Sequence, residues 1–166
     1  MSALIGMGGN VGDPKNNLRE ALALIQNKFT LLKKSSLYRT AAVGGPDGQP
    51  DCYNAVIEVD PKEFDPRKTL AYLHEIERKM GRVRKEKWGP RIIDLDLLDQ
   101  DGVIIDESDI SIPHPMISER SFVLGPLREI YPEWKHPVSG KTAEQLWNKL
   151  PESDKSVILA IEEWSS

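Results

Sequence analysis

The stretch IDLDLL, residues 93–98, alternates apolar and acidic side chains, and this period of two is typical of a β-strand. Successive side chains of a strand point to opposite faces, so Asp94 and Asp96 share one face and lie roughly 7 Å apart. The leucines that alternate with them then point into a core. We therefore predict a strand over residues 92–98 that presents two neighbouring carboxylates.

Two neighbouring carboxylates repel one another unless a cation lies between them. Mg²⁺ suits such a pair, because it binds carboxylates together with substrate phosphates in an octahedral shell. An ordinary amphipathic strand with a wet acidic face is the alternative. Residues 82–91, RVRKEKWGPR, favour the metal site, because five basic residues and one acidic residue directly precede the strand region. Cations for phosphate beside carboxylates for metal are the components of phosphoryl transfer, whereas a solvated basic loop is the other interpretation of this stretch.

Three further strands are expected on the N-terminal side of this stretch. Residues 3–7 are a short apolar run, residues 31–42 are a longer extended segment, and residues 53–59 are a third. The Gly- and Pro-rich residues 44–50 predict a loop between the last two strands.

Two helices are expected between these strands. Asp13-Pro14 and Asp65-Pro66 each combine an N-cap residue with a proline at the first helical position. Gly81 is expected to close the second helix in the left-handed conformation. The resulting order, β-α-β-β-α-β, is that of a ferredoxin-like α+β sandwich.

The glycines near the N-terminus do not complete a nucleotide-binding motif. Gly6, Gly8 and Gly12 resemble a dinucleotide fingerprint, but its third glycine would fall at Val11. We therefore interpret these glycines as turn residues.

The C-terminal third carries weaker signals. Residues 103–105 and 157–161 are candidate short strands, and Thr142 with Gln145 forms a candidate capping box. No linker is long enough to separate two domains. We expect one domain over residues 1–166, with residues 138–166 as a C-terminal extension.

The composition indicates a globular protein of modest size. The 166 residues are 39% hydrophobic and 29% charged, with a net charge of −4 and a mean hydropathy of −0.43. The acidic balance argues against a nucleic-acid-binding protein. No apolar run approaches the roughly 18 residues of a membrane span, and no basic region precedes the apolar N-terminal residues, so a secretory signal is not expected. Cys52 is the only cysteine, which excludes an internal disulfide and favours a cytoplasmic location.

Two aromatic or imidazole side chains are candidates for ligand contacts. His114 lies between two prolines in a stiff, extended segment, and Arg120 follows it by six residues. This arrangement favours a phosphate contact, although a lone histidine is more often surface or core filler. Trp88, within the basic stretch, is either a core anchor or a lid over a planar ligand.

Together these motifs stand in the order found in one enzyme family. They are Gly8-Gly9-Asn10-Val11-Gly12-Asp13, Tyr38-Arg39-Thr40, Gln49-Pro50 with Asn54, Gly81-Arg82-Val83-Arg84, Trp88-Gly89-Pro90-Arg91 with Asp94-Leu95-Asp96, Pro113-His114 with Arg120 and Phe122, and Pro126-Leu127. Over about residues 3–137 the chain resembles the 6-hydroxymethyl-7,8-dihydropterin pyrophosphokinases. The resemblance implies a ferredoxin-like fold and the transfer of diphosphate from ATP to the pterin's hydroxymethyl group, with release of AMP, in folate biosynthesis. It also implies two Mg²⁺ ions, and we expect a monomer without nucleic-acid or membrane partners.

The resemblance also implies site residues. The catalytic set is Arg82, Arg91, Asp94 and Asp96, of which the two aspartates bind the metal ions. The ATP-binding set is His74, Glu77, Arg82, Arg84, Lys85, Trp88, Arg91, Leu97, Ser111, His114 and Arg120. The pterin-binding set is Thr40, Ala41, Val43, Cys52, Asn54, Trp88, Asp94 and Phe122.

The chain departs from the family pattern at several of these positions. Cys52 stands where a second stacking aromatic is usual, His74 replaces a glutamine, Ala41 and Ala42 replace prolines, and Asp109 replaces an arginine. None of these changes removes a metal-binding carboxylate, so we expect activity, with pterin affinity the property most affected. The alternatives are a homologue that binds ATP without turnover and a ferredoxin-like module that binds RNA or another ligand.

Overall fold

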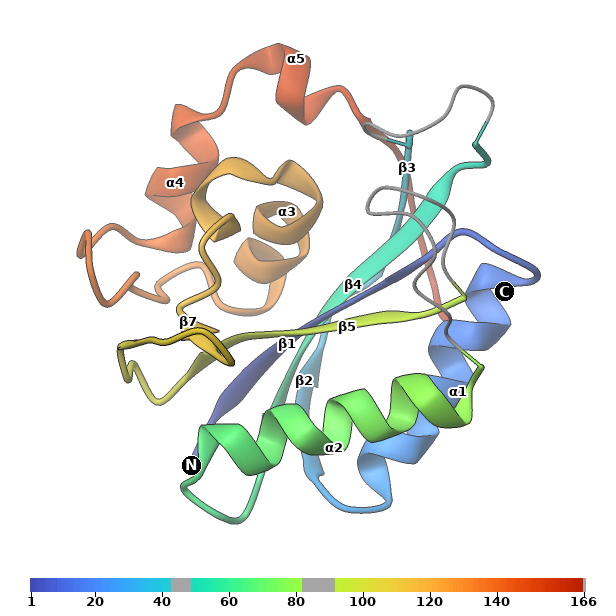
Figure 1. Ribbon diagram of the computed structural model, residues 1–166. Helices are drawn as coiled ribbons and strands as arrows, with labels where there is room; N and C mark the ends of the chain where they lie inside the picture. Colours follow the sequence, from blue (N-terminus) through green and yellow to red (C-terminus); the bar gives the residue numbers. More distant parts are fainter. Residues whose placement is uncertain (43–48, 82–91, 166) are drawn as a thin grey trace.

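Among the residues that the structure describes, a six-stranded antiparallel sheet runs through the centre of the molecule (Figure 1). The strand order is β5-β1-β4-β3-β8, and β2 pairs with β4 next to β3. The strands are β1 (Ala3–Gly9), β2 (Thr30–Lys34), β3 (Leu37–Thr40), β4 (Cys52–Asp60), β5 (Asp94–Gln100) and β8 (Ile158–Glu162). This computed structural model describes residues 1–42, 49–81 and 92–165.

Helices cover both faces of the sheet and form two cores. On one face, α1 (Pro14–Gln26) and α2 (Pro66–Lys79) pack around Ile5, Leu18 and Leu73 (Figure 1). On the other face, the longer helix is α3 (Ser121–Ile130), which packs with α4 around Leu4 and Leu124. The remaining elements are α4 (Ala143–Lys149), α5 (Glu152–Lys155), the 3₁₀ turn η1 (Ile117–Glu119), and the paired short strands β6 (Ile105–Asp106) and β7 (Ser111–Ile112). Within the described residues, no helix has the length and apolar character needed to cross a membrane.

The predicted helix ends are confirmed. The Asp13 side chain accepts a hydrogen bond from the N–H of Asn16, and the Asp65 side chain accepts one from the N–H of Arg67. Each helix has proline in its first turn, where a missing N–H leaves no intrahelical bond unmade. Gly81 follows α2 with φ of 79°, in the left-handed region that glycine adopts without steric cost.

The long strand predicted over residues 31–42 is in fact two strands, β2 and β3. Buried Ser35 lies between them, and its N–H donates to the carbonyl of Val56 at 3.0 Å. The Ser35 hydroxyl accepts the N–H of the same Val56, also at 3.0 Å. Because this hydroxyl takes the place of a main-chain carbonyl, it interrupts the regular ladder.

The prediction of turn roles for Gly6 and Gly8 was wrong, because β1 continues to Gly9 and both residues lie inside it. The candidate strand over residues 103–105 lies at Ile105–Asp106 instead. A reverse turn occupies the residues before it, with Asp101 and Gly102 at positive φ.

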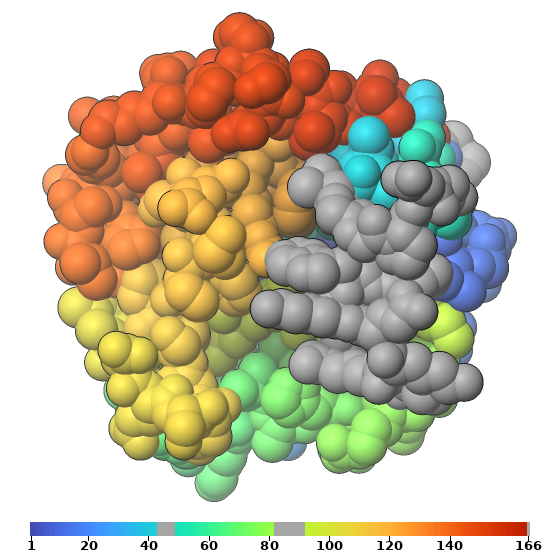
Figure 2. Space-filling view, turned by 45° about the horizontal axis from the view of Figure 1, so that its top comes forward, coloured from blue at the N-terminus to red at the C-terminus, as the bar shows by residue number. Residues whose placement is uncertain are grey.

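The C-terminal segment completes the sheet. The strand expected over residues 157–161 is β8, which pairs antiparallel with β3. The capping box is confirmed, since the Thr142 and Gln145 side chains each accept the other residue's N–H. Figure 2 shows these C-terminal residues, in red, as a continuous band along one border of the molecule, next to the orange segment that includes α3.

Candidate active site

Asp94, Gly8 and Asn54 form a row across three adjacent strands. Asp94 of β5 pairs with Gly8 of β1, and Gly8 pairs in turn with Asn54 of β4. Residues directly opposite one another in an antiparallel sheet share a face. A carboxylate and an amide therefore lie on one face, with no side chain between them.

The two predicted metal-binding carboxylates lie on this same face. Asp96 pairs with Gly6, which in turn pairs with Val56, a residue of the core beneath α3. Asp94 and Asp96 are half-buried, whereas Leu95 and Leu97 are buried on the opposite face against α1 and α2. The predicted alternation of the strand is thus confirmed.

Asn54 is held in one orientation above β1. Its Nδ2 donates to the hydroxyl of Thr40 at 2.8 Å, and Thr40 is only 1% exposed. Its Oδ1 lies above Gly8, only 2.7 Å from the position that a Cβ there would occupy. The structure thereby brings together two of the residues predicted to bind the pterin.

His114 lies close to Asp94 and Arg120. Burial lowers the pKa of the His114 imidazole, the positive charge of Arg120 lowers it further, and the negative charge of Asp94 opposes them. The Nδ1 atom accepts the N–H of Met116 at 3.1 Å. A neutral imidazole with this bond carries its proton on Nε2, so Nε2 is a hydrogen-bond donor.

Arg120 and Phe122 are neighbours at the N-terminal end of α3. The guanidinium carbon of Arg120 lies 5.6 Å from the centre of the Phe122 ring, within the range of a cation–π interaction. Both side chains are half-buried. A residue predicted for the ATP side and one predicted for the pterin side are therefore in contact.

Glu77 connects α2 to the strand that carries the two aspartates. It is 4% exposed, and its Oε2 accepts the N–H of Leu95 at 2.9 Å. Strand β5 is last in the strand order and, within the described residues, pairs with β1 alone, so N–H groups on its outer side need acceptors from elsewhere. Glu77 supplies such an acceptor for Leu95, which lies between Asp94 and Asp96. His74 is half-buried on the same helix, one turn before Glu77.

Two other residues predicted for the ATP side have different surroundings. Leu97 is 4% exposed and its side chain belongs to the core beneath α1 and α2. The predicted contact with the nucleotide would therefore be made by its main-chain atoms. Ser111 opens β7, is half-buried and pairs with Asp106.

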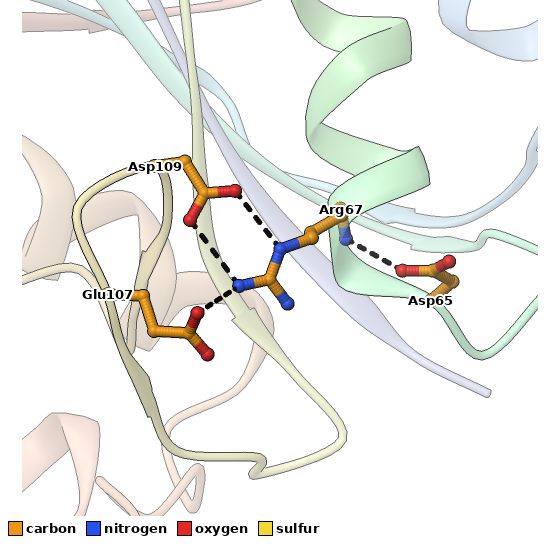
Figure 3. A network of polar contacts seen from close by, with 4 residues as sticks. All are labelled: Asp65, Arg67, Glu107 and Asp109. Atoms are coloured by element: carbon orange, nitrogen blue, oxygen red, sulfur yellow. Dashed lines mark hydrogen bonds and ion pairs between the residues drawn. The ribbon is translucent and has the colours of Figure 1, made fainter.

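Asp109, one of the departures from the family pattern, forms an ion pair with Arg67, a residue that sequence reasoning did not identify. Arg67 Nε lies 3.1 Å from the Asp109 carboxylate, and its Nη2 lies 2.7 Å from that of Glu107 (Figure 3). The Arg67 guanidinium holds the pKa of Asp109 below its usual value. The first turn of α2, capped by Asp65, is thus joined to the loop between β6 and β7. No short motif links residues 67 and 109, so only the fold reveals this pair.

Cys52 faces the site, and Tyr53 does not. Cys52 pairs with Thr40 and lies two residues before Asn54 along β4, so the three share a face. Burial raises the pKa of the Cys52 thiol, which is therefore neutral at pH 7. Tyr53 points to the opposite face, where its hydroxyl donates to Glu162 at 3.1 Å. Ala41 lies just beyond β3, half-buried, and its N–H donates to the carbonyl of Val157.

The remaining site predictions fall outside the described residues. These are Val43, Arg82, Arg84, Lys85, Trp88 and Arg91. In the parts of the chain that the structure describes, no three His, Cys, Asp or Glu side chains group as metal ligands. Asp94 and Asp96 alone still fit Mg²⁺, which is usually held by one or two carboxylates together with substrate phosphates and water.

The fold and the site define a class of protein. The sheet with helices on both faces carries a carboxylate pair, an amide held over a glycine, and a neutral histidine beside an arginine. Carboxylates suit a metal–phosphate complex, and an oriented amide suits the edge of a flat heterocycle. These features suit an enzyme that binds a phosphate group and a heterocycle on one face of the sheet.

Comparison with known proteins identifies the family. Residues 4–132 match the family described as 7,8-dihydro-6-hydroxymethylpterin-pyrophosphokinase (HPPK). The 2-amino-4-hydroxy-6-hydroxymethyldihydropteridine pyrophosphokinase of Synechocystis sp. is 43% identical over 147 residues, which cover 87% of this chain and 73% of that protein. The enzyme of the same name from Bacillus subtilis is 39% identical over 130 residues, or 77% of each chain. The chain belongs to the HPPK family and is a pyrophosphokinase.

A solved structure supports the fold independently. Plasmodium falciparum HPPK-DHPS, crystallised with pteroate, matches 89% of this chain with a TM-score of 0.72 at 17% sequence identity. The match covers 44% of that longer chain. At this identity the likeness concerns the fold alone.

Proposed function

We propose that this chain transfers diphosphate from ATP to the hydroxymethyl group of 6-hydroxymethyl-7,8-dihydropterin and releases AMP. Membership of the HPPK family supports this reaction. The observation that carries the assignment of residues is the row Asp94–Gly8–Asn54, which aligns a carboxylate and an amide on one face of the sheet.

Asp94 and Asp96 would hold two Mg²⁺ ions together with the phosphates of ATP. Bound Mg²⁺ neutralises the phosphate charge and lowers the pKa of the acceptor hydroxyl. Asp94, which lies in the same row as Asn54, orients that hydroxyl toward the nucleotide. Positioning and charge neutralisation are most of what a loose phosphoryl-transfer transition state requires.

Asn54 forms hydrogen bonds with the edge of the pterin. One Nδ2–H donates to Thr40, which leaves the Oδ1 acceptor and the second Nδ2–H donor for groups on the heterocycle. Phe122 covers one face of the ring. The proposed pterin site is completed by Ala41, Val43, Cys52 and Trp88.

The ATP side is built around His114 and Arg120. The Nε2–H of a neutral His114 and the guanidinium of Arg120 both donate to phosphate oxygens. Glu77 holds β5 in place through Leu95. The same side is completed by His74, Arg82, Arg84, Lys85, Trp88, Arg91, Leu97 and Ser111.

The ferredoxin-like arrangement is also proposed. Strands β5, β1 and β4 are followed in the sheet by β3, with β2 also paired to β4, and α1 and α2 share one face. This layout supports the β-α-β-β-α-β order with β2 and β3 as two parts of one long strand. Residues 138–166 extend the same domain, since α4 packs against α3 and β8 pairs with β3.

An assay of nucleotide products tests the proposal. The purified chain is incubated with MgATP, with and without 6-hydroxymethyl-7,8-dihydropterin, and AMP and ADP are separated. Pterin-dependent AMP is expected, whereas ADP would show transfer of the γ-phosphate. A folded sample that binds ATP and forms neither product would favour a binding module.

The metal assignment has a matched pair of variants. Asp96→Ala is expected to lose most of the turnover and keep the fold, because it removes a ligand from a half-buried strand face. Asp106→Ala, an exposed aspartate of β6, is the control. Unchanged turnover of Asp96→Ala at saturating Mg²⁺ would refute the assignment.

A further inference from the structure

Gly8 is the one position in the row where the structure leaves no room for a side chain. A Cβ at Gly8 would lie 2.7 Å from Asn54 Oδ1, closer than Cβ atoms are found to other heavy atoms. Its backbone does not require glycine, since its φ is outside the left-handed region. The constraint at Gly8 therefore comes from the amide above it.

The amide cannot simply move aside. Asn54 Nδ2 is bound to the Thr40 hydroxyl at 2.8 Å, and Thr40 is buried on the neighbouring strand. A methyl group at Gly8 would push Oδ1 away and either stretch or break this bond. The Asn54 amide would then lose the orientation that its hydrogen bond to Thr40 maintains.

Gly8 also lies between the two residues that the proposed acceptor must reach, Asn54 and Asp94. Adjacent strands are about 4.8 Å apart, so Asp94 and Asn54 are separated by about 10 Å across β1. A bicyclic heterocycle whose edge meets Asn54 can therefore extend its substituent across β1 toward Asp94.

We infer that Gly8 is a positioning residue for the acceptor: because it has no side chain, the Asn54 amide keeps the orientation in which Thr40 holds it. This inference rests on the proposed function. It predicts weaker binding of the pterin, with unchanged nucleotide binding and an unchanged fold, and these properties can be measured separately.

Gly6 provides a matched control. It lies in the same strand and on the same face, but the nearest described atoms to a Cβ there belong to the Leu98 side chain, at 3.4 Å or more, an ordinary contact. Both glycines carry ordinary strand conformations. Gly6→Ala and Gly8→Ala therefore differ mainly in what the new methyl group meets.

Calorimetric titration with 6-hydroxymethyl-7,8-dihydropterin, in Mg²⁺ and α,β-methylene ATP, measures the effect without turnover. Gly8→Ala is expected to weaken pterin binding at least tenfold and to leave the affinity for the nucleotide unchanged. Gly6→Ala is expected to bind the pterin within twofold of wild type. In steady-state assays the KM for the pterin rises in Gly8→Ala, and the KM for ATP does not.

A double-mutant cycle shows whether the effect acts through the amide. Asn54→Ala alone weakens pterin binding, and adding Gly8→Ala to it is expected to cause little further loss, because the clash is already absent. The double variant also folds if Gly8→Ala alone does not. The inference is overturned if Gly8→Ala binds the pterin like wild type, if its loss is undiminished in the Asn54→Ala background, or if both Gly8 variants fail to fold. A wild-type chain that binds nucleotide but no pterin overturns the proposed function, and this inference with it.

Discussion

Replacing Glu77 with alanine removes the carboxylate that accepts the N–H of Leu95 at 2.9 Å. This N–H lies on the outer side of β5, and both residues are buried, with Glu77 4% and Leu95 2% exposed. A hydrogen bond to a charged group contributes about 1.5–3 kcal/mol, and the buried N–H would be left without a partner. We expect Glu77→Ala to lower the free energy of unfolding by about 2 kcal/mol, which corresponds to a fall in Tm of about 4–8 °C for a chain of this size.

Thermal and urea unfolding of Glu77→Ala, Glu77→Gln and Glu75→Ala measure this effect. Glutamine keeps an acceptor without the charge, so Glu77→Gln is expected to retain about 1 kcal/mol more stability than Glu77→Ala. Glu75 is exposed on the same helix and serves as the control. A Glu77→Ala variant within 0.5 kcal/mol of wild type, a margin of about the size typical of surface substitutions, would show that Glu77 does not anchor β5.

Two further predictions concern pH and the pterin site. Burial lowers the pKa of His136 below its usual 6.5, so its contribution to stability is fully present above pH 6.5 and is lost as the pH falls through the lowered value. His136→Asn, which keeps an acceptor, is expected to lose less stability than wild type between pH 7 and pH 5 in urea unfolding, and an identical loss would contradict this. Cys52→Phe places an aromatic ring on the face that carries Asn54 and is expected to tighten pterin binding roughly threefold to tenfold. Weaker binding in calorimetry would mean that the smaller thiol already fits the pterin.

The local elements could be predicted from the sequence because their causes are local. The alternation in residues 93–98 determines which side chains of β5 share a face, and the structure confirms it. Asp-Pro pairs begin α1 and α2 because an N-cap acceptor and a proline both suit the first turn. In each case the residues that act are adjacent in the chain.

The features that could not be predicted depend on residues far apart in the chain. Ser35 divides the second strand because Val56 meets both its N–H and its hydroxyl. A side chain at Gly8 would clash because the Asn54 amide lies above it. The periodicity of a sequence does not indicate which strands will be neighbours in the sheet. It therefore cannot predict contacts between residues on different strands.

Part of the C-terminal segment, which lies outside the family match, supports the strand that carries Thr40. Thr40, which orients Asn54, lies at the end of β3, and the next residue, Ala41, donates its N–H to Val157 at 2.8 Å. At the other end of β3, the indole N–H of buried Trp164 donates to the carbonyl of Ser35 at 2.7 Å. Residues 157–164 therefore hold β3 at both ends. Because β3 in turn fixes the Asn54 amide through Thr40, we expect loss of this segment to disturb the proposed pterin site before the aspartates on β5, which lie on the far side of β1 and β4.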